Sequence, residues 1–555
     1  MERPVWWVLA VLLLCVVLGA YFRSYHLDYP SIGYHNWKEN RYLTAARNFD
    51  REGFFAYGIF VPAYDLPKLR AEPSGAHSDF FPVSSIAAAL MFKLFGLKLW
   101  AARLPGMLVS TLTIILMYLV VRRLFERDDI ALVAAALTAI NPLFIFFSHN
   151  VDQMPYGLFF VALAWCLFFR WLDNDTGYFL LLAAFAAAIG VMTKYTYVMS
   201  LLPILAVFPY TRLREWRTRW PVLAGASALV ALAPLWWYYA SYVLTAVYGG
   251  SAQGEGALKI TPLFEPGTLA ILKSFTADNY TLVGLLFAFI GLALFLLLRK
   301  RLSVLCRRFV LAYVASSALL VLLVAESIKG HSYHQFPLAP LIIILIAYLF
   351  TVVAVTVSHY IKLPYVRSVV LVLLFFVPVP VFSYAVNGIG SHTLFFSSMQ
   401  AANRQWDTQF FGLDVAGEYV RTHKSAGDRI IHSSHQAFGI LWHGDLKGTR
   451  GIPGTVEDIQ FAEQQLNANW LFIYNWDFGI FNEPRWDYLS QNYRLVQIAF
   501  MQQQGQSVPV YLLLRKGGTI DINDINGMIA GKPPRTANYE LTGGAVAMQY
   551  INIEP

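Results

Sequence analysis

The side chains that could do chemistry in this chain gather in a few polar segments between long apolar ones. The densest is the loop 25–101, which carries Glu39 within WKENRY and Asp79 within AHSDF. Carboxylates can act as general bases or bind a divalent metal, and lysine, arginine and aromatic side chains can hold a lipid phosphate. Similar residues lie in polar turns elsewhere in the chain: Asp152, Lys194, His331 and His334.

Together these residue types suit the transfer of a phosphate-linked group to an acceptor hydroxyl or amine. Such a displacement needs a base for the acceptor and positive charge on the departing phosphate. Each residue alone has a simpler interpretation: Glu39 can form a surface ion pair, Asp152 can cap a helix, and interfacial lysines and histidines are common. The argument for a site is therefore that the elements of the fold place these residues on one face.

Composition places the chain among membrane proteins. Hydrophobic residues make up 57% and charged residues 14% of the 555 residues, and the mean hydropathy is +0.49. An ordinary soluble domain has ~25% charged residues. The net charge of +8 is spread in short basic clusters, which indicates topology and no nucleic-acid partner. The three cysteines lie in or beside apolar segments, so no disulfide framework or thiolate metal site is predicted.

The apolar segments predict a polytopic α-helical membrane protein. At ~20 residues per span they give about eleven transmembrane helices, the first of them retained and not cleaved as a signal peptide. The predicted spans are 5–24, 102–124, 129–148, 154–171, 176–193, 195–210, 221–241, 282–299, 309–328, 336–357 and 367–385.

Basic clusters follow the second, sixth, eighth and tenth spans, which makes those ends cytoplasmic by the positive-inside rule. The loop 25–101, the turns at 148–155 and 329–335, and the chain after residue 386 then lie outside the plasma (inner) membrane. Within the loop, the helical spacing of Trp37, Arg41 and Tyr42 predicts a juxtamembrane helix over 36–50, and apolar periodicity predicts a second over 83–95. All the candidate residues therefore share the outer face.

The composition turns polar after residue 386, where short apolar runs alternate with helical patterns. We predict a transmembrane domain over 1–385 and an extracytoplasmic soluble α/β domain over 386–555. Its expected strands include 440–444, 469–476 and 508–516, and its expected helices 414–424 and 456–467. No Walker-type loop or Rossmann glycine pattern is visible, so no nucleotide cofactor is expected and an energised pump is disfavoured.

The motifs, in this order, resemble those of integral-membrane glycosyltransferases of the C-type fold, close to the lipid A aminoarabinose transferase and the protein O-mannosyltransferases. The resemblance covers about residues 1–360. One departure concerns the first acidic position of the family's loop motif, usually an aspartate central to catalysis, which is Lys38 here. The matching motifs are Lys38–Tyr42, Asp79, Lys93–Gly96, Arg103–Pro105, Arg122–Phe125, Asp152, Thr193–Lys194, His331–Tyr333 and Leu338–Pro340.

The resemblance implies a multi-pass hexosyl- or pentosyltransferase. It would pass a sugar from a polyprenyl-phosphate donor to a lipid, glycan or protein acceptor at the outer face of the plasma membrane. Glu39 or Asp152 would activate the acceptor. The remaining expected roles are donor-phosphate binding by Lys38, Arg41 and Lys194, substrate binding by His35, Trp37, Tyr42 and Tyr333, and binding of a divalent cation, if one is used, by Asp79, His77 and His331.

Two other classes stay open from the residues alone. A secondary transporter or lipid flippase usually shows charged residues within its spans and inverted repeats, and neither is visible in this sequence. A non-catalytic scaffold or receptor would use its outer domain as the working part. Substitution of Glu39 and Asp152 distinguishes these classes, because only a transferase loses turnover while it keeps its fold.

Overall fold

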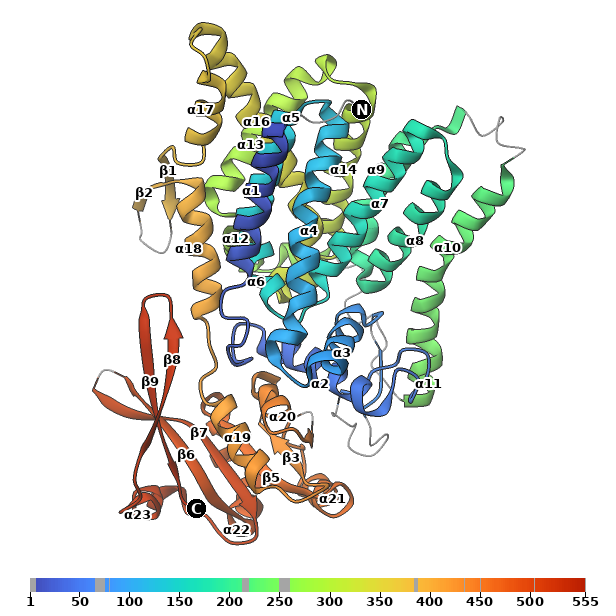
Figure 1. Cartoon of the computed structure of the whole chain (residues 1–555). Helices are drawn as coiled ribbons and strands as arrows, with labels where there is room; N and C mark the ends of the chain where they lie inside the picture. The colour runs from blue at the N-terminus through green and yellow to red at the C-terminus, as the bar shows by residue number, and fades with distance from the viewer. Residues whose placement is uncertain are drawn as a thin grey trace.

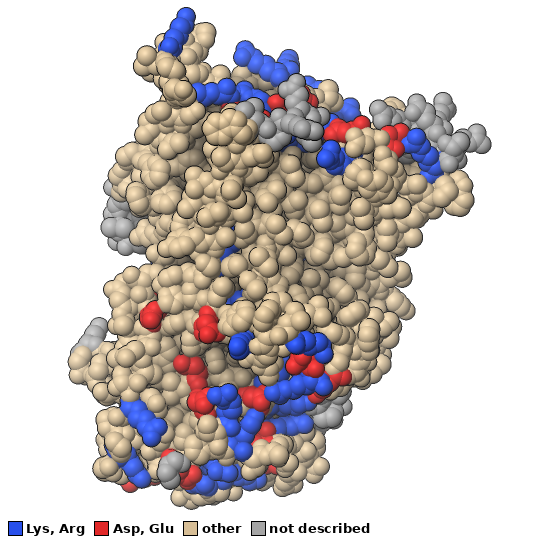
Figure 2. All heavy atoms as spheres, in the orientation of Figure 1, with Lys and Arg blue, Asp and Glu red and all other residues tan. Residues whose placement is uncertain are grey.

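The structure is a computed structural model that describes residues 6–64, 75–78, 80–211, 219–248, 260–383, 388–433, 435–449, 451–503 and 505–554. Helices make up most of the chain as far as residue 373, and a mixed sheet with flanking helices forms its C-terminal part (Figure 1). Figure 2 shows charged residues gathered toward the two ends of the molecule, with a broad band of other residues between them. Such a band is the surface expected of a protein embedded in a membrane.

Seven of the described helical segments are long and apolar enough to cross a membrane. An eighth crossing is made if α5 (Asp128–Ile140) and α6 (Pro142–His149), bent by 49°, are one broken span. The bend falls at Pro142, which has no backbone N–H to continue the helix. The seven segments are α1 (Trp6–Arg23), α4 (Leu99–Phe125), α7 (Met154–Asn174), α10 to α11 (Trp220–Tyr248), α13 with its last turn (Leu282–Arg301), α14 (Val304–Leu323) and η6 with α16 (Ser332–Tyr360).

The predicted count of eleven spans is not confirmed. The predicted spans 176–193 and 195–210 correspond to the shorter apolar helices α8 (Gly177–Thr193) and η1 with α9 (Tyr195–Val207). The prediction for 367–385 is wrong, because α17 (Val366–Leu373) has only 8 residues and is followed by the antiparallel hairpin of β1 (Val379–Ser383) and β2 (Gly388–His392). Pro378 and Pro380 disfavour continuation of the helix there, whereas strands tolerate proline at an edge.

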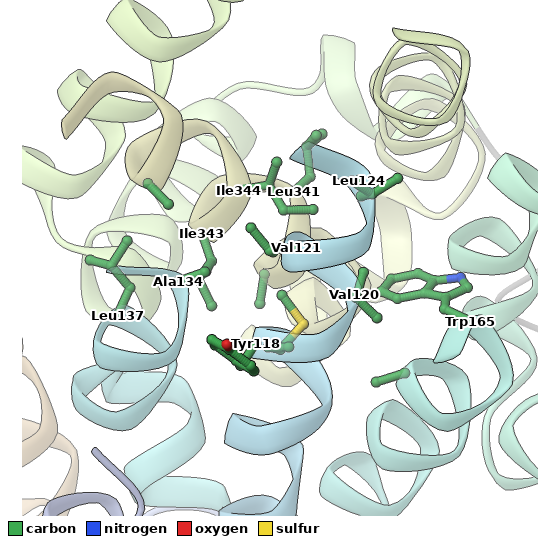
Figure 3. Close-up of a cluster of buried hydrophobic side chains, with 14 of the residues drawn as sticks. Tyr118, Val120, Val121, Leu124, Ala134, Leu137, Trp165, Leu341, Ile343 and Ile344 are labelled. Atoms are coloured by element: carbon green, nitrogen blue, oxygen red, sulfur yellow. The ribbon is translucent and has the colours of Figure 1, made fainter. Parts of the chain in front are cut away.

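The core of the helical part lies where α4, α5, α7 and α16 meet (Figure 3). Small residues of α5 allow its neighbours to approach closely, as is typical of helix packing in membranes. The approach of α13 to α16 is closer still, since a Cβ added at Gly291 would lie 2.2 Å from the carbonyl oxygen of Leu345. The labelled core side chains are Tyr118, Val120, Val121, Leu124, Ala134, Leu137, Trp165, Leu341, Ile343 and Ile344.

The C-terminal sheet has seven strands in the order β4-β3-β5-β7-β6-β9-β8. The pairs β3–β4 and β3–β5 are parallel and the others antiparallel. Alternate residues of β5 face two separate cores, with Trp470 and Phe472 on one side and Leu471 and Ile473 on the other. The strands are β3 (Arg429–His432), β4 (Lys447–Gly448), β5 (Ala468–Tyr474), β6 (Tyr493–Gln503), β7 (Gln506–Lys516), β8 (Arg535–Leu541) and β9 (Gly544–Asn552).

Helices cover both faces of this sheet. The first core contains α19 (Leu413–His423) and α20 (Gly439–His443), and the second contains α21 (Val456–Leu466) and α22 (Pro484–Asn492), near α23 (Ile525–Ile529). The predicted strands 469–476 and 508–516 and helices 414–424 and 456–467 are confirmed to within a few residues. The strand predicted over 440–444 is wrong: Ile440 and Leu441 are consecutive and enter the same core, which an α-helix allows and a strand with alternating faces does not.

Two helices of the first loop, α2 (Asn36–Glu52) and α3 (Val83–Phe95), lie between the helical part and the sheet (Figure 1). Both were predicted from the sequence, α2 from the spacing of its polar and aromatic residues and α3 from apolar periodicity. Helix α2 contacts α3 on one side and α20 on the other, and the sequence before α2 is fixed by a hydrogen bond from the Phe410 amide to the Ile32 carbonyl. Three further helices complete this region: α12 (Thr268–Tyr280), α15 (Ala325–Gly330) and α18 (Leu394–Asp407).

Candidate active site

Helix α2 is the element that positions the candidate site. His35 precedes it with φ 58°, a left-handed conformation that turns the chain into the helix. One face of α2 packs against α3 through Tyr42, Leu43, Ala46 and Phe49. The polar residues of its first turns are also buried, including Lys38 and Glu39. A buried charge is costly unless it is paired, so the partners of these residues indicate what each one does.

Glu39 forms a buried ion pair with Arg103 of α4. The Nε and Nη2 atoms of Arg103 donate to the carboxylate at 2.8 and 3.0 Å. Two more hydrogen bonds come from the Ser31 hydroxyl at 2.5 Å and the Val151 amide at 3.0 Å. Burial acts to raise the pKa of Glu39, but the charge of Arg103 and the hydrogen bonds to the carboxylate together outweigh it, and the pKa is lowered. Four donors on one carboxylate leave it a weak base, so this geometry does not favour Glu39 as the base.

Lys38 and Asp152 form a second buried ion pair, one residue along the helix from the first. The Nζ of Lys38 lies 2.7 Å from Oδ2 of Asp152, and the two side chains are 5% and 4% exposed. The other carboxylate oxygen accepts a hydrogen bond from the Met154 amide at 2.7 Å, so Asp152 also caps the start of α7. Burial lowers the pKa of Lys38 despite the opposing charge of Asp152.

Aromatic and imidazole rings surround Lys38. Its Nζ lies 3.2 Å from the centroid of the Tyr333 ring, a cation–π contact. The rings of His35 and His331 both pack against Tyr333, at centroid distances of 5.3 and 5.1 Å. Trp37 packs against His331 at 5.4 Å. These rings form one aromatic cluster, called the aromatic wall below, of a kind that proteins use against sugar rings and cations.

Several buried polar atoms at this wall have no hydrogen-bond partner among the described residues. They are His35 Nε2, both amide atoms of Asn36, and His334 Nδ1. Burial, with smaller contributions from the charges of His331 and Lys38, lowers the pKa of His35 well below its ordinary value, so this imidazole is neutral at pH 7. Buried groups without partners are rare in folded proteins and are consistent with a site that a polar ligand completes.

Two further cations lie in the same region. The Nη2 of Arg41 donates to Nε2 of His77 at 2.7 Å, and the guanidinium lies 4.2 Å from the centroid of the Tyr64 ring. The Nζ of Lys194 lies 3.8 Å from the Phe80 ring centroid. Electrostatic interactions link Arg41 to Lys38, and His334 to both Lys194 and Lys38. Of the three predicted phosphate-binding residues, Lys38 contacts Asp152 directly, and Arg41 and Lys194 lie near Lys38 and His334.

The predicted metal ligands are not brought together in the described part of the chain. Since arginine can only donate, Nε2 of His77 accepts from Arg41, and Nδ1 lies 3.1 Å from the Gly75 carbonyl oxygen. Both ring nitrogens are thus engaged, which does not fit a metal ligand. His331 lies in the aromatic wall, Asp79 lies outside the described residues, and the described residues hold no group of three or more His, Cys, Asp or Glu suited to a metal.

Tyr42 and Arg103 differ from the sequence prediction, which gave Tyr42 a substrate-binding role and gave Arg103 none. Tyr42 lies in the α2–α3 core and burial raises its pKa well above the ordinary value, so its hydroxyl stays protonated. Arg103 was noted only as part of a motif, although an arginine at the start of an apolar span must have a partner. That signal, together with an acidic residue in the preceding loop, is what could have identified the Glu39–Arg103 pair from the sequence.

Comparison with known proteins defines the class of fold. The family model for dolichyl-phosphate-mannose-protein mannosyltransferases matches residues 76–238. The chain is 31% identical over 153 residues to the undecaprenyl phosphate-alpha-4-amino-4-deoxy-L-arabinose arabinosyl transferase of Pseudomonas aeruginosa, a match that covers 26% of this chain and 27% of the relative. Matches to the first curated relatives span 27% to 44% of their lengths.

Two solved structures align over most of the chain. One is the oligosaccharyltransferase AglB from Archaeoglobus fulgidus in complex with an inhibitory peptide and a dolichol-phosphate. The alignment covers 91% of this chain and 74% of the AglB chain, with TM-score 0.54 and 13% identity. ArnT from Cupriavidus metallidurans, bound to undecaprenyl phosphate, covers 91% and 98% with TM-score 0.51 and 10% identity. The chain is thus a multi-pass membrane protein of the C-type glycosyltransferase fold with a C-terminal α/β part, and the predicted fold class is confirmed.

Proposed function

We propose that this chain is a glycosyltransferase that moves a sugar from a polyprenyl-phosphate donor to a hydroxyl or amine of a lipid, glycan or protein acceptor. The observation that carries the proposal is the buried ion pair of Asp152 with Lys38 in a C-type fold. Lys38 interacts electrostatically with Arg41, and His334 interacts with both Lys38 and Lys194. The matched family and the solved relatives, whose names specify polyprenyl-phosphate sugars or carriers, support it.

Asp152 is the base in this proposal. Its carboxylate accepts the proton of the acceptor hydroxyl or amine while the acceptor atom attacks the anomeric carbon of the sugar. The bond from that carbon to the phosphate oxygen breaks, and its electron pair leaves on the phosphate. Polyprenyl phosphate and the glycosylated acceptor are the products. The sugar–phosphate bond supplies the driving force, so no nucleotide is required.

Lys38 has two partners in this scheme. Without donor it neutralises Asp152, as its 2.7 Å ion pair shows. The phosphate of the donor offers it a second anion, and a lysine that turns toward the phosphate leaves Asp152 as a stronger base. Lys194 and Arg41 add positive charge to the leaving phosphate. The lysine at the usual aspartate position thereby links donor binding to activation of the base.

The aromatic wall provides the sugar site. His35, Trp37, His331 and Tyr333 present ring faces, and the orphaned nitrogens of His35 and His334 supply polar contacts to sugar hydroxyls. A divalent metal at the leaving phosphate would supply Lewis-acid charge. One structure of the Archaeoglobus fulgidus oligosaccharyltransferase is a complex with Zn and sulfate. The residues described here do not fit such an ion, and no step is assigned to one.

The active site faces the outside of the cell in this proposal. The ends of α4 and α13 opposite the site carry the basic clusters Arg122–Arg123 and Arg299–Arg301, which the positive-inside rule assigns to the cytoplasm. The sheet domain then caps the site from the outer side and contributes to acceptor selection. A transporter or flippase is disfavoured, because the buried charges lie at the ends of spans and not along a path through them.

The test uses purified protein in lipid nanodiscs with a panel of radiolabelled polyprenyl-phosphate sugars. Wild type should release polyprenyl phosphate from one of them, Asp152→Asn should not, and the exposed control Asp487→Asn should equal wild type. Thermal unfolding of the three proteins is measured alongside, and release is compared per folded molecule because Asp152→Asn removes the buried partner of Lys38. If folded wild type neither binds nor consumes any sugar lipid of the panel, the transferase proposal fails and transport assays take priority.

A further inference from the structure

The turn between α13 and α14 carries five cations that take no part in the proposed catalysis. They are Arg299, Lys300 and Arg301 at the end of α13, and Arg307 and Arg308 in the first turns of α14. Four of them are exposed and Arg307 is half-buried. Positive charges so close in the sequence repel one another unless a negative charge lies near them. A negative partner is therefore expected at this turn.

The acidic residues at this end of the helical part are already paired with other arginines. The five cations of the turn form no ion pair and no side-chain hydrogen bond in the part of the chain that the structure describes. Their negative partner is therefore expected from outside the chain. The ion pairs at this end are Arg122–Asp128, Arg123–Glu126, Arg123–Asp173, Arg127–Asp129, Arg219–Asp175 and Arg367–Asp129.

Exposed apolar side chains lie next to these cations on both helices. On α13, Leu297 is 76% exposed and precedes Lys300 by three residues, which places the two side chains on one face. On α14, Val304 is 53% exposed and precedes Arg307 and Arg308 by three and four residues. The cations thus border helix surface of the kind that faces acyl chains in a membrane.

The turn itself is held in place by contacts on its other side. The Ser303 hydroxyl accepts from the Cys306 amide at 3.2 Å and donates to the Leu124 carbonyl of α4 at 3.5 Å. Arg301 interacts electrostatically with Tyr348 of α16, whose ring packs against Phe125 of α4 at 5.6 Å. A turn fixed in this way presents its cations without a further cost of ordering the backbone.

The combination of cations and apolar surface favours a lipid over a soluble anion. Anionic phospholipids place phosphate groups at the level where lipid-facing helices end, and they attract lysine and arginine there. A guanidinium group can donate two parallel hydrogen bonds to one phosphate, and an ammonium group adds a point charge. A nucleotide or a nucleic acid has the phosphates but no acyl chains to cover Leu297 and Val304.

We infer that the turn between α13 and α14 binds the phosphate groups of anionic phospholipids in the surrounding membrane leaflet. The lipid phosphates neutralise the five cations, and the acyl chains cover the exposed apolar residues beside them. Because such a lipid binds the folded turn, it stabilises the folded protein in proportion to its affinity. This inference does not depend on the proposed glycosyl transfer.

The experiment counts the lipids bound to full-length protein. Purified protein in dodecyl maltoside is titrated with phosphatidylglycerol or phosphatidylcholine, and native mass spectrometry gives the affinity for each. The turn variant carries Arg299→Gln and Arg301→Gln. The charge-matched control carries Arg170→Gln and Lys362→Gln, two exposed cations outside the turn that also have no ion-pair partner among the described residues.

Wild type and the control should bind phosphatidylglycerol more tightly than phosphatidylcholine. The turn variant should bind phosphatidylglycerol about 25-fold more weakly than wild type, since each cation near an anionic surface contributes about fivefold in affinity. Its affinity for phosphatidylcholine should be unchanged. Equal affinity of all three proteins for phosphatidylglycerol would overturn the inference, because the charge of the turn would then have no influence on lipid choice.

Thermal unfolding in nanodiscs gives a second measurement. Replacing phosphatidylcholine by phosphatidylglycerol should raise the melting temperature of wild type and of the control by more than that of the turn variant. Inorganic phosphate at the same ionic strength should not reproduce this difference. If it does, the turn is a site for soluble anions and the inference fails.

Discussion

The two buried ion pairs formed by neighbouring residues of α2, Lys38–Asp152 and Glu39–Arg103, differ in how many partners their carboxylates have. Glu39 and Arg103 satisfy each other, and the carboxylate has four donors in all. Lys38 and Asp152 are also buried, but Asp152 has fewer partners: one oxygen accepts from the Met154 amide and the other pairs with Lys38. Lys38 in turn contacts the face of the Tyr333 ring. The first pair is closed and the second is open to exchange with a ligand.

The difference shows why burial alone does not identify a catalytic residue. A buried pair whose members are saturated with hydrogen bonds stabilises the local structure only if it stays intact, since loss of one partner leaves an uncompensated charge. A buried pair next to orphaned polar atoms retains the capacity to change partners. The number of donors already on a carboxylate is therefore a better guide to its role than its depth.

The largest expected effect separates the two carboxylates. Asp152→Asn keeps an oxygen for the Met154 amide and loses the base, so turnover per folded molecule should fall about 10³-fold, as for removal of a general base. The melting temperature should fall as well, because Lys38 loses its buried ion-pair partner. Polyprenyl phosphate release measured per folded molecule checks this. If Glu39→Gln instead abolishes turnover in well-folded protein while Asp152→Asn does not, the assignment of the two pairs is reversed.

The next effect is on stability. Arg103→Met leaves the Glu39 carboxylate buried without its partner and should lower the free energy of unfolding by about 3–5 kcal/mol. Thermal unfolding in nanodiscs measures it, with the exposed variant Arg421→Met as control. Because the carboxylate pKa is lowered in the folded state, the contribution of Glu39 is present at neutral pH and is lost as pH falls through that pKa.

Lys38 gives a smaller effect that depends on pH. Only its ammonium form attracts a phosphate, and burial lowers its pKa, so affinity for undecaprenyl phosphate should decline at a lower pH than an exposed lysine would require. Lys38→Arg keeps its charge and should move this decline to higher pH. Binding titrations between neutral and alkaline pH, with Lys98→Arg as control, check it; identical profiles for all three proteins would show that Lys38 does not face the phosphate.

The smallest effect concerns the docking of the sheet domain. Asp445 accepts from Arg47 at 2.7 Å and from Arg51 at 2.9 and 3.1 Å, which joins the sheet domain to α2. The site is partly exposed, so Asp445→Asn should cost only about 1 kcal/mol, and less at high salt. Hydrogen exchange of α20 reports the change, and an unaltered rate would show that apolar contacts alone hold this interface.

The sequence predicted the helices of the first loop from the helical spacing of their residues. It predicted most elements of the C-terminal domain from short apolar runs and helical patterns separated by turn signals. It overestimated the number of spans where two prolines follow a short apolar helix, as at 367–385. The topology predicted that Lys38, Arg41, Asp152 and Lys194 share one face of the membrane. It did not predict the exact pairing, because the partners of Lys38 and Glu39 lie more than 60 residues away and alternate charges on one helix can be paired in several ways.

The continuity of α2 has a mechanical consequence. One end of this 17-residue rod carries Lys38 and the other carries Arg47 and Arg51, which hold the sheet domain. A helix of this length spans about 25 Å and transmits displacement without bending. The sheet domain and Lys38 share this one helix, so a displacement of the domain that moves α2 also moves the Lys38 ammonium group relative to the Asp152 carboxylate.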